Sequence, residues 1–290
     1  MKRVDRLRDQ LSDRDLAILA DVQLFRLLTT SQIRRLHFTT GHQTTGAATR
    51  ACTRVLTRLR GHGLISTLTR RIGGVRQGST SLTWQLAATG DWLLRQLHGN
   101  AYRRRYHEPS PEFVKHTLAV SELGVQLRET AARETVELVG LAIEGGAHRA
   151  FLGSDGTKET LKPDLYAITA TTDFESHWLI EADRAKEHSP HLLRKLAAYR
   201  RYFNSGRYQA EYGLFPSVLW VVPDDNRRRQ LAALIESESL PSQLFQICTF
   251  DEFIDLVVSK TVGVESLPLP GILESTVEHQ QLAPSPNSLD

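Results

Sequence analysis

The chain has 290 residues, with 36 Lys and Arg against 33 Asp and Glu, and 40% of its residues are hydrophobic. This length allows two domains, and the composition is that of an ordinary globular protein. The sequence has no apolar run of about 18 residues, so it predicts no membrane span, and it has no apolar stretch near the N-terminus that would form a secretory signal. Two cysteines exclude a disulfide framework. We therefore expect a cytoplasmic protein that does not bind membranes.

The formal net charge of +3 hides a strong asymmetry along the chain. Residues 1–107 carry 19 basic and 6 acidic side chains, whereas the rest of the chain carries 17 and 27. No Asp or Glu occurs between Asp21 and Asp91, although ten arginines do. This asymmetry predicts two parts with different partners, the first of which binds a polyanion.

The pattern of the first part predicts three helices followed by a hairpin. Ser12 precedes two acidic residues and an apolar stripe, which is typical of a capped helix start. We expect the first helix over residues 12–28, a short second helix that begins at a cap at Thr30 or Ser31, and a third helix over residues 45–60. Strands over residues 64–70 and 81–86 form the hairpin, and a further helix follows over residues 91–98. This order is that of a winged helix-turn-helix, which we expect over residues 1–98, with double-stranded DNA as its partner.

The helix over 45–60 has two chemically different faces. Its apolar residues recur at spacings of three and four, and the opposite face carries Thr49, Arg50, Thr53, Arg54, Thr57 and Arg58. Arginines at i, i+4 and i+8 repel one another, and no Glu relieves them, so an anionic partner is a better explanation than a solvated face. We expect Arg50 and Arg54 to reach base edges, and Arg58 and the wing residues Arg70, Arg71 and Arg76 to contact phosphates.

A change of pattern divides the chain after this first part. Residues 99–112 resemble a linker with a basic run at Arg103–Arg105, and residues 262–290 are rich in Pro and Ser and read as a disordered tail. Between them, residues 113–261 predict the element order αβββαβαβα. The expected fold class is therefore mixed α and β.

That element order is similar to the core of the PD-(D/E)xK nuclease superfamily, which includes the restriction endonucleases. The resemblance implies an αβββαβ domain in which carboxylates hold Mg²⁺ and a lysine neutralises developing charge on phosphate. Asp164, after Pro163, stands where the first carboxylate is expected, and Glu181 stands on the following strand. Asp183 lies two residues further and should share a strand face with Glu181.

Position 183 is also where this sequence departs from the superfamily, because an Asp occupies the position of the lysine. Lys195 on the next helix is our first candidate for a displaced lysine, and Lys186 is the second. The predicted catalytic set is therefore Asp164, Glu181, Asp183 and Lys195, with the three carboxylates as ligands of Mg²⁺. Glu122 and Glu144 are candidates for an additional ligand.

The whole arrangement resembles the replication-relaxation family of plasmid and mobile-element proteins over about residues 12–255. The matching features are the N-terminal winged helix, the Pro163-Asp164 strand, Glu181-x-Asp183-Arg184 with Glu187, and Lys195-Leu196-x-x-Tyr199. The resemblance implies a role in replication or DNA relaxation, and with an active site it implies a Mg²⁺-dependent nickase.

Two other functions remain open from the sequence. The first is a strand-transfer enzyme with Tyr199 and Tyr202 as candidate nucleophiles, although their spacing is more typical of packing residues. The sequence lacks the His-x-His pair that would form the metal site of a rolling-circle relaxase. The second is a non-catalytic transcription or replication regulator. Its degenerate nuclease-like domain would form a homodimer or bind replication or conjugation proteins.

Overall fold

The computed structural model describes residues 7–68, 82–99, 109–133, 135–185, 189–237 and 244–263. Several predictions concern residues outside these ranges. They are the turn of the hairpin with Arg70, Arg71 and Arg76, the basic run Arg103–Arg105, the alternative lysine Lys186 with Glu187, and the tail from residue 264.

The described residues from 7 to 99, here the N-terminal unit, contain four helices and a small antiparallel sheet. The sheet order is β1-β3-β2, and β2 pairs with β3 through Ile65 and Leu86. The elements are α2 (Asp13–Phe25), β1 (Leu28–Thr29), α3 (Thr30–His37), α4 (Thr45–Gly61), β2 (Ile65–Thr67), β3 (Thr83–Leu86) and α5 (Ala88–His98).

Helix α4 confirms the predicted helix over 45–60 together with its end. Thr44 caps the first turn by accepting a hydrogen bond from the backbone N–H of Ala47. The chain leaves the helix through Gly63, whose φ of +70° lies in the left-handed region that favours glycine. The buried face is the predicted one, with Ala48, Cys52, Leu56 and Leu59 inside.

The described residues from 109 to 263, here the C-terminal unit, are built on a five-stranded mixed sheet with the order β10-β9-β8-β7-β4. Strands β4, β7 and β8 are antiparallel, and β8, β9 and β10 are parallel. The strands are β4 (Glu137–Ile143), β5 (Arg149–Leu152), β6 (Lys158–Leu161), β7 (Leu165–Ala170), β8 (Glu175–Ala182), β9 (Ser217–Val222) and β10 (Phe245–Thr249). The helices are α6 (Pro111–Ala131), α7 (Ser189–Asn204), α8 (Arg207–Tyr212), α9 (Asp225–Ser237) and α10 (Phe253–Gly263), with a short 3₁₀ turn at Glu144–Gly146.

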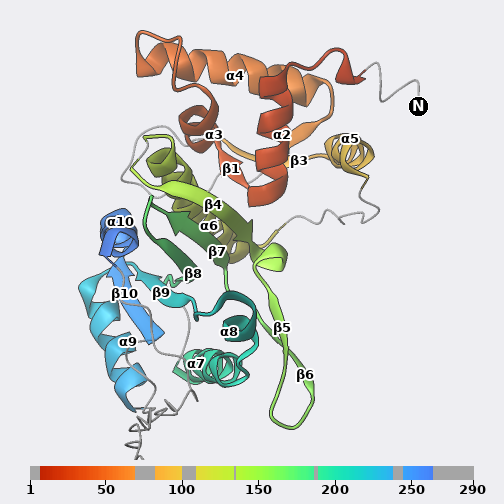
Figure 1. The fold of residues 1–290 in the computed structure, drawn as a ribbon. Coiled ribbons are helices and arrows are strands. Elements are labelled where there is room, and N and C mark those ends of the chain that lie inside the picture. The colour runs from red at the N-terminus through yellow and green to blue at the C-terminus, as the bar shows by residue number, and fades with distance from the viewer. Residues whose placement is uncertain are drawn as a thin grey trace, which may run out of the picture.

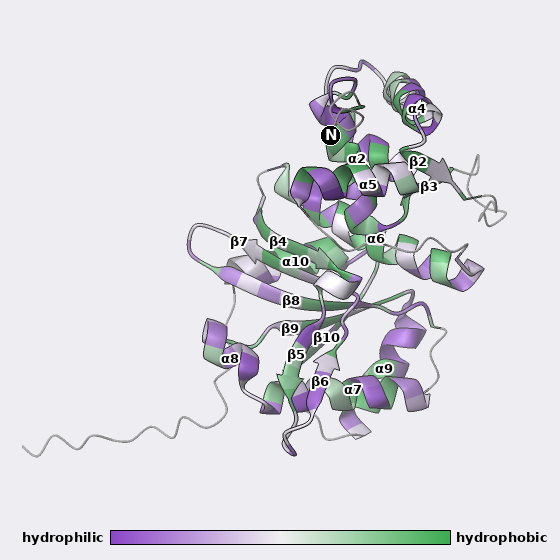
Figure 2. Cartoon of the chain, turned by 90° about the vertical axis from the view of Figure 1, so that its right-hand side faces the viewer, coloured by the Kyte–Doolittle hydropathy of each residue, from purple (hydrophilic) through white to green (hydrophobic). Residues whose placement is uncertain are grey.

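Helices cover both faces of this sheet (Figure 1). Alternate residues of β8 point to opposite sides, so Trp178 and Ile180 face α6 and α10, whereas Leu179 faces α7, α8 and α9. Both β8 and β9 are buried along nearly their whole length. Strand β9 is almost wholly apolar, whereas β8 starts with polar residues, and Figure 2 shows β8 turning from purple to green along its length. The fold class is therefore mixed α and β, as predicted.

Three elements differ from the sequence expectation. Leu28–Thr29 forms β1, paired with Trp84 and Thr83, where the start of a helix was expected. The hairpin of β5 and β6 adds a two-stranded sheet, so the expected strand over 161–169 is divided and Asp164 precedes β7. The six-residue α8 between Gly206 and Gly213 was not predicted, because it is too short to show a helical period.

The two units share one hydrophobic core. Buried residues of α2 and α4 belong to the same cluster as residues of α6 and of the sheet face beneath it. Figure 1 shows the N-terminal unit above β4 and α6, with α4 along its outer side. None of the helices within the described ranges is long and apolar enough to cross a membrane.

Candidate functional site

Asp164 lies at the end of the sheet where β4, β7 and β8 meet. It directly precedes β7, and its carbonyl oxygen accepts a hydrogen bond from the backbone N–H of Glu144 at 2.9 Å. Its Oδ2 accepts a second bond from the backbone N–H of Ala182, also at 2.9 Å. The carboxylate is therefore held against the end of β8, with 17% of the side chain exposed.

Glu181 occupies the next strand and is buried, with 1% of its side chain exposed. Lys195 Nζ lies 2.8 Å from Glu181 Oε2, and the Tyr199 hydroxyl donates to Oε1 at 2.5 Å. Lys195 and Tyr199 are four residues apart on α7 and so lie on one helix face. The Lys195 ammonium also lies 5.3 Å from the centre of the Trp220 ring, a favourable cation–π distance.

His116 completes this cluster and was not predicted from the sequence. Its Nε2 lies 3.1 Å from Asp164 Oδ1, and 37% of its side chain is exposed. It comes from the first turns of α6, 48 residues before Asp164. A single histidine on an amphipathic helix carries no spacing signal, so only the packing of α6 on the sheet reveals it.

The two carboxyl groups differ in acidity because their surroundings differ. Burial alone would raise the pKa of Asp164, but the bond with His116 and the charge of Lys195 outweigh it and lower the pKa to about 2. Burial raises the pKa of Glu181 to about 8, and the charge of Asp164 adds to the increase against the opposing effect of Lys195. One carboxylate and one carboxylic acid at neutral pH are thus held beside one lysine.

The tyrosines of α7 do not have the properties of an activated nucleophile. Burial and the charge of Glu181 raise the pKa of Tyr199 well above its usual value, and burial raises the pKa of Tyr202 to about 12. Both side chains are buried and remain protonated at neutral pH. Tyr199 instead donates a hydrogen bond from its hydroxyl to Glu181, which orients that carboxyl group.

Asp183 points to the same sheet face as Glu181, as the strand period requires, but it is bound by a different helix. Arg227 of α9 donates from Nε to Asp183 Oδ2 at 2.7 Å, and the Asp183 side chain has no exposed surface. The backbone N–H of Ala185 donates to Oδ1. The expected convergence of Asp183 with the other two carboxylates is therefore replaced by a buried ion pair with a residue 44 positions later.

The additional acidic candidates are also engaged elsewhere. Glu122 accepts hydrogen bonds from Arg35 and Gln32, and Glu144 pairs with Arg26. Within the described ranges, no three His, Cys, Asp or Glu side chains form a group suited to a metal ion. The acidic cluster therefore consists of Asp164 and Glu181, with His116 beside them.

The predicted DNA-binding side chains of α4 lie on one exposed face. Arg50, Thr53, Arg54 and Thr57 are all exposed. Arg58 is also exposed in part, but its Nη2 donates to both oxygens of the buried Asp15 at 2.6 and 2.7 Å. Arg58 thus ties α4 to the first turn of α2, an anchoring contact that the sequence did not indicate.

Comparison with known protein families places this chain in one of them. A family model described as replication-relaxation matches residues 19–218, which span both units and include Asp164, Glu181, Lys195 and the whole of α4. No curated protein matches the chain. No solved structure matches it either.

Proposed function

Because the chain belongs to the replication-relaxation family, we propose that it binds double-stranded DNA of a plasmid or integrative element and nicks one strand with the help of Mg²⁺. Family membership carries the role in replication or relaxation. The DNA contact and the strand cleavage are inferred from the residues of α4 and from the cluster around Asp164.

The N-terminal unit supports the DNA-binding part of this proposal. Three helices followed by the antiparallel pair of β2 and β3 have the order of a winged helix-turn-helix, with α4 as its recognition helix. Arg50 and Arg54 lie on the exposed side of α4, away from the buried residues of that helix. Cations in such a row bind phosphates by displacing condensed counterions.

The cleavage part rests on one observation, the meeting of Asp164 before β7, Glu181 near the end of β8 and Lys195 from within α7. The sheet order supports a nuclease-like fold, because β4, β7 and β8 form an antiparallel meander that continues in parallel into β9. Lys195 arrives from α7 and supplies the positive charge that position 183 lacks.

The residues present fit a divalent cation bound through two carboxyl groups. Mg²⁺ is commonly held by one or two carboxylates together with water and substrate phosphate, so a third protein ligand is not required. The raised pKa of the buried Glu181 also fits, because a second positive charge beside it would favour its ionised form. When bound, Mg²⁺ supplies activation of water and neutralisation of phosphate charge.

The remaining side chains have distinct roles in this proposal. Lys195 stabilises negative charge that develops on the phosphate. Tyr199 orients Glu181, and His116 holds Asp164 on the partly exposed side of the cluster.

A non-catalytic regulator is the second candidate function. The observation that favours it is the closure of the site, since both oxygens of Glu181 are already engaged by Tyr199 and Lys195 and the carboxyl group is buried. In that case the C-terminal unit serves homodimerisation or the binding of replication or conjugation proteins.

Incubation with supercoiled plasmid distinguishes the two functions. We expect the wild-type chain with Mg²⁺ or Mn²⁺ to produce open-circular DNA, and we expect EDTA or Asp164→Ala to abolish the product. Asp173→Ala, which removes an exposed acid from the turn between β7 and β8, is the control that should retain activity. Equal nicking by Asp164→Ala would remove catalysis from this site, and the absence of metal-dependent nicking by the wild type supports the regulator.

A further inference from the structure

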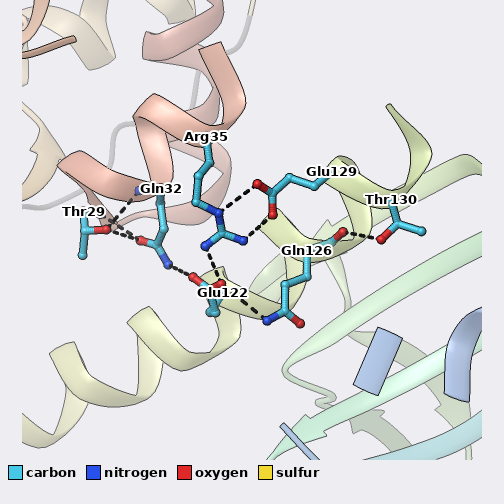
Figure 3. Close-up of polar contacts among 7 residues, drawn as sticks. All are labelled: Thr29, Gln32, Arg35, Glu122, Gln126, Glu129 and Thr130. Carbon is cyan, nitrogen blue, oxygen red and sulfur yellow. Dashed lines mark hydrogen bonds and ion pairs between the residues drawn. The ribbon is translucent and has the colours of Figure 1, made fainter. Parts of the chain in front are cut away.

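Helix α3 of the N-terminal unit is bonded to α6 through a shared polar network (Figure 3). Arg35 donates from Nε to Glu129 at 2.9 Å, pairs with the same carboxylate through Nη2, and donates from Nη1 to Glu122 at 2.5 Å. Gln32 donates to the other oxygen of Glu122 at 2.9 Å. Gln32 also closes the capping box of α3, so the first turn of that helix is fixed to α6.

A second set of charged contacts restrains the same interface. Asp21 of α2 is 6% exposed, pairs with Arg128 of α6, and lies 2.8 Å from His37 Nε2. Arg26, directly after α2, pairs with Glu144 at the end of β4. Half-buried charges that lose their partners are costly, so these pairs oppose any sliding of one unit over the other.

Close packing between the units leaves little room for movement. Gly124 of α6 lies against Phe25, and a Cβ at this position would lie 2.6 Å from the ring. Ser121 Oγ lies 2.9 Å from the carbonyl oxygen of Leu27. These contacts oppose movement of α2 over α6, and the bonds of Arg35 and Gln32 to α6 oppose movement of α3.

Helix α6 also reaches the candidate site. His116 in its first turns contacts Asp164, and Glu122 in its middle binds α3. At 1.5 Å per residue, six residues of helix separate these contacts by about 9 Å along the axis. One rigid element therefore joins the unit that carries α4 to the acidic cluster.

We propose that α6 holds α4 at a fixed position relative to Asp164 and Glu181, so that the chain cuts DNA at a constant distance from the sequence that it binds. The constant cutting distance rests on the proposed nicking function, whereas the fixed position of α4 relative to Asp164 and Glu181 does not depend on that function. Arg35, Glu122, Glu129 and Arg128 are then determinants of where the strand is cut.

Distances between two spin labels test the fixed geometry without any catalysis. Arg60→Cys on α4 and Arg200→Cys on α7 offer exposed labelling positions, and the native Cys52 and Cys248 are buried. We expect a single narrow distance distribution, unchanged by duplex DNA, that broadens in Arg35→Ala/Arg128→Ala. Arg34→Ala, a neighbouring charge outside the network, should leave it narrow.

Mapping of the nick tests the consequence. Base pairs are inserted between the footprint of the wild-type chain and its nick, and we expect the nick to stay at the same distance from the footprint. In Arg35→Ala/Arg128→Ala we expect the single dominant position to be lost and the nicks to spread. If the nick instead stays at the original cut sequence, and so moves away from the footprint by the inserted length, a fixed distance is contradicted.

The two readouts separate the failure of this inference from the failure of the nicking function. A broad distance distribution in the wild type, or a double variant as narrow as the wild type, overturns the inference whether or not DNA is cut. Narrow distances that broaden in the double variant, together with no cleavage, uphold the fixed geometry and remove the nicking function alone.

Discussion

Lys195 Nζ lies 2.8 Å from Glu181 Oε2, so a lysine reaches the acidic cluster from α7 and not from β8. The strand position two residues after Glu181 belongs to Asp183, which is paired with Arg227 of α9. The two acidic residues at the end of β8 therefore differ in their surroundings. Glu181 faces a lysine and a second carboxylate, and Asp183 anchors a helix.

Asp183→Asn is expected to destabilise the fold. The change leaves the guanidinium of Arg227, whose side chain is 11% exposed, without its carboxylate partner. Breaking a buried ion pair typically costs about 3–5 kcal/mol, so we expect urea denaturation to show a loss of that order in the free energy of unfolding.

Asp173→Asn is the matched control for this change, because it removes the same charge from an exposed turn. Its free energy of unfolding should stay within about 0.5 kcal/mol of the wild type. A stable Asp183→Asn variant that has lost a metal-dependent activity would reverse the roles assigned to Asp183 and Glu181.

The raised pKa of Glu181 predicts a pH dependence of stability. The folded chain retains a proton on Glu181 up to about pH 8, whereas the unfolded chain releases it near the usual glutamate pKa of 4.5. The unfolded state therefore binds fewer protons across this window, and stability falls as pH rises from 4.5 to 8. At about 1.4 kcal/mol per pKa unit, the loss over this window is up to about 5 kcal/mol.

Glu181→Gln isolates this contribution, because an amide does not titrate. We expect the difference in unfolding free energy between wild type and Glu181→Gln to shift steadily in favour of the variant between about pH 5 and pH 8. The lowered pKa of Asp164 acts only below its usual value of 3.8 and adds no slope in this window. Parallel stability curves for the two proteins would show that the pKa of Glu181 is not raised.

Arg50→Ala/Arg54→Ala is expected to weaken DNA binding and to reduce its dependence on salt. Each lost phosphate contact removes about 0.9 from the slope of log affinity against log salt concentration, and a lost base contact costs about 1–3 kcal/mol. Fluorescence anisotropy with duplex DNA over a range of salt concentrations measures both quantities.

Arg60→Ala is the control for charge alone, because Arg60 is exposed on α4 but lies two residues, about 200° of helix rotation, from Arg58. We expect it to bind DNA with nearly wild-type affinity and salt dependence. Unchanged affinity of Arg50→Ala/Arg54→Ala for duplex DNA, with an unchanged salt slope, would remove α4 from the DNA interface.

Most elements of the fold were accessible from the sequence because they depend on local pattern. The apolar spacing, cap and glycines of α4 define that helix, and the continuous apolar run of β9 defines a strand buried on both faces. Short elements such as β6 and α8 lack enough residues to show a period. They form because the surrounding sheet and helices pack against them.

The site was less accessible because its contacts join distant parts of the chain. The positions of Asp164 and Glu181 follow from strand order, and α7 brings Lys195 to them as the next element. The partners of His116 and Asp183 lie 48 and 44 residues away, and no residue spacing encodes such contacts. Arg58 similarly had an unforeseen buried partner in Asp15.

The central claim is that Asp164 and Glu181 form the cation-binding pair of this chain, and titration with Mn²⁺ followed by electron paramagnetic resonance tests it most directly. We expect the wild type to bind one Mn²⁺ and to bind it more tightly at about pH 8.5 than at about pH 6.5, because the cation displaces the proton of Glu181. Asp164→Asn should lose this binding and a folded Asp183→Asn should keep it. Equal Mn²⁺ binding by wild type and Asp164→Asn, or none by the wild type, would contradict the claim.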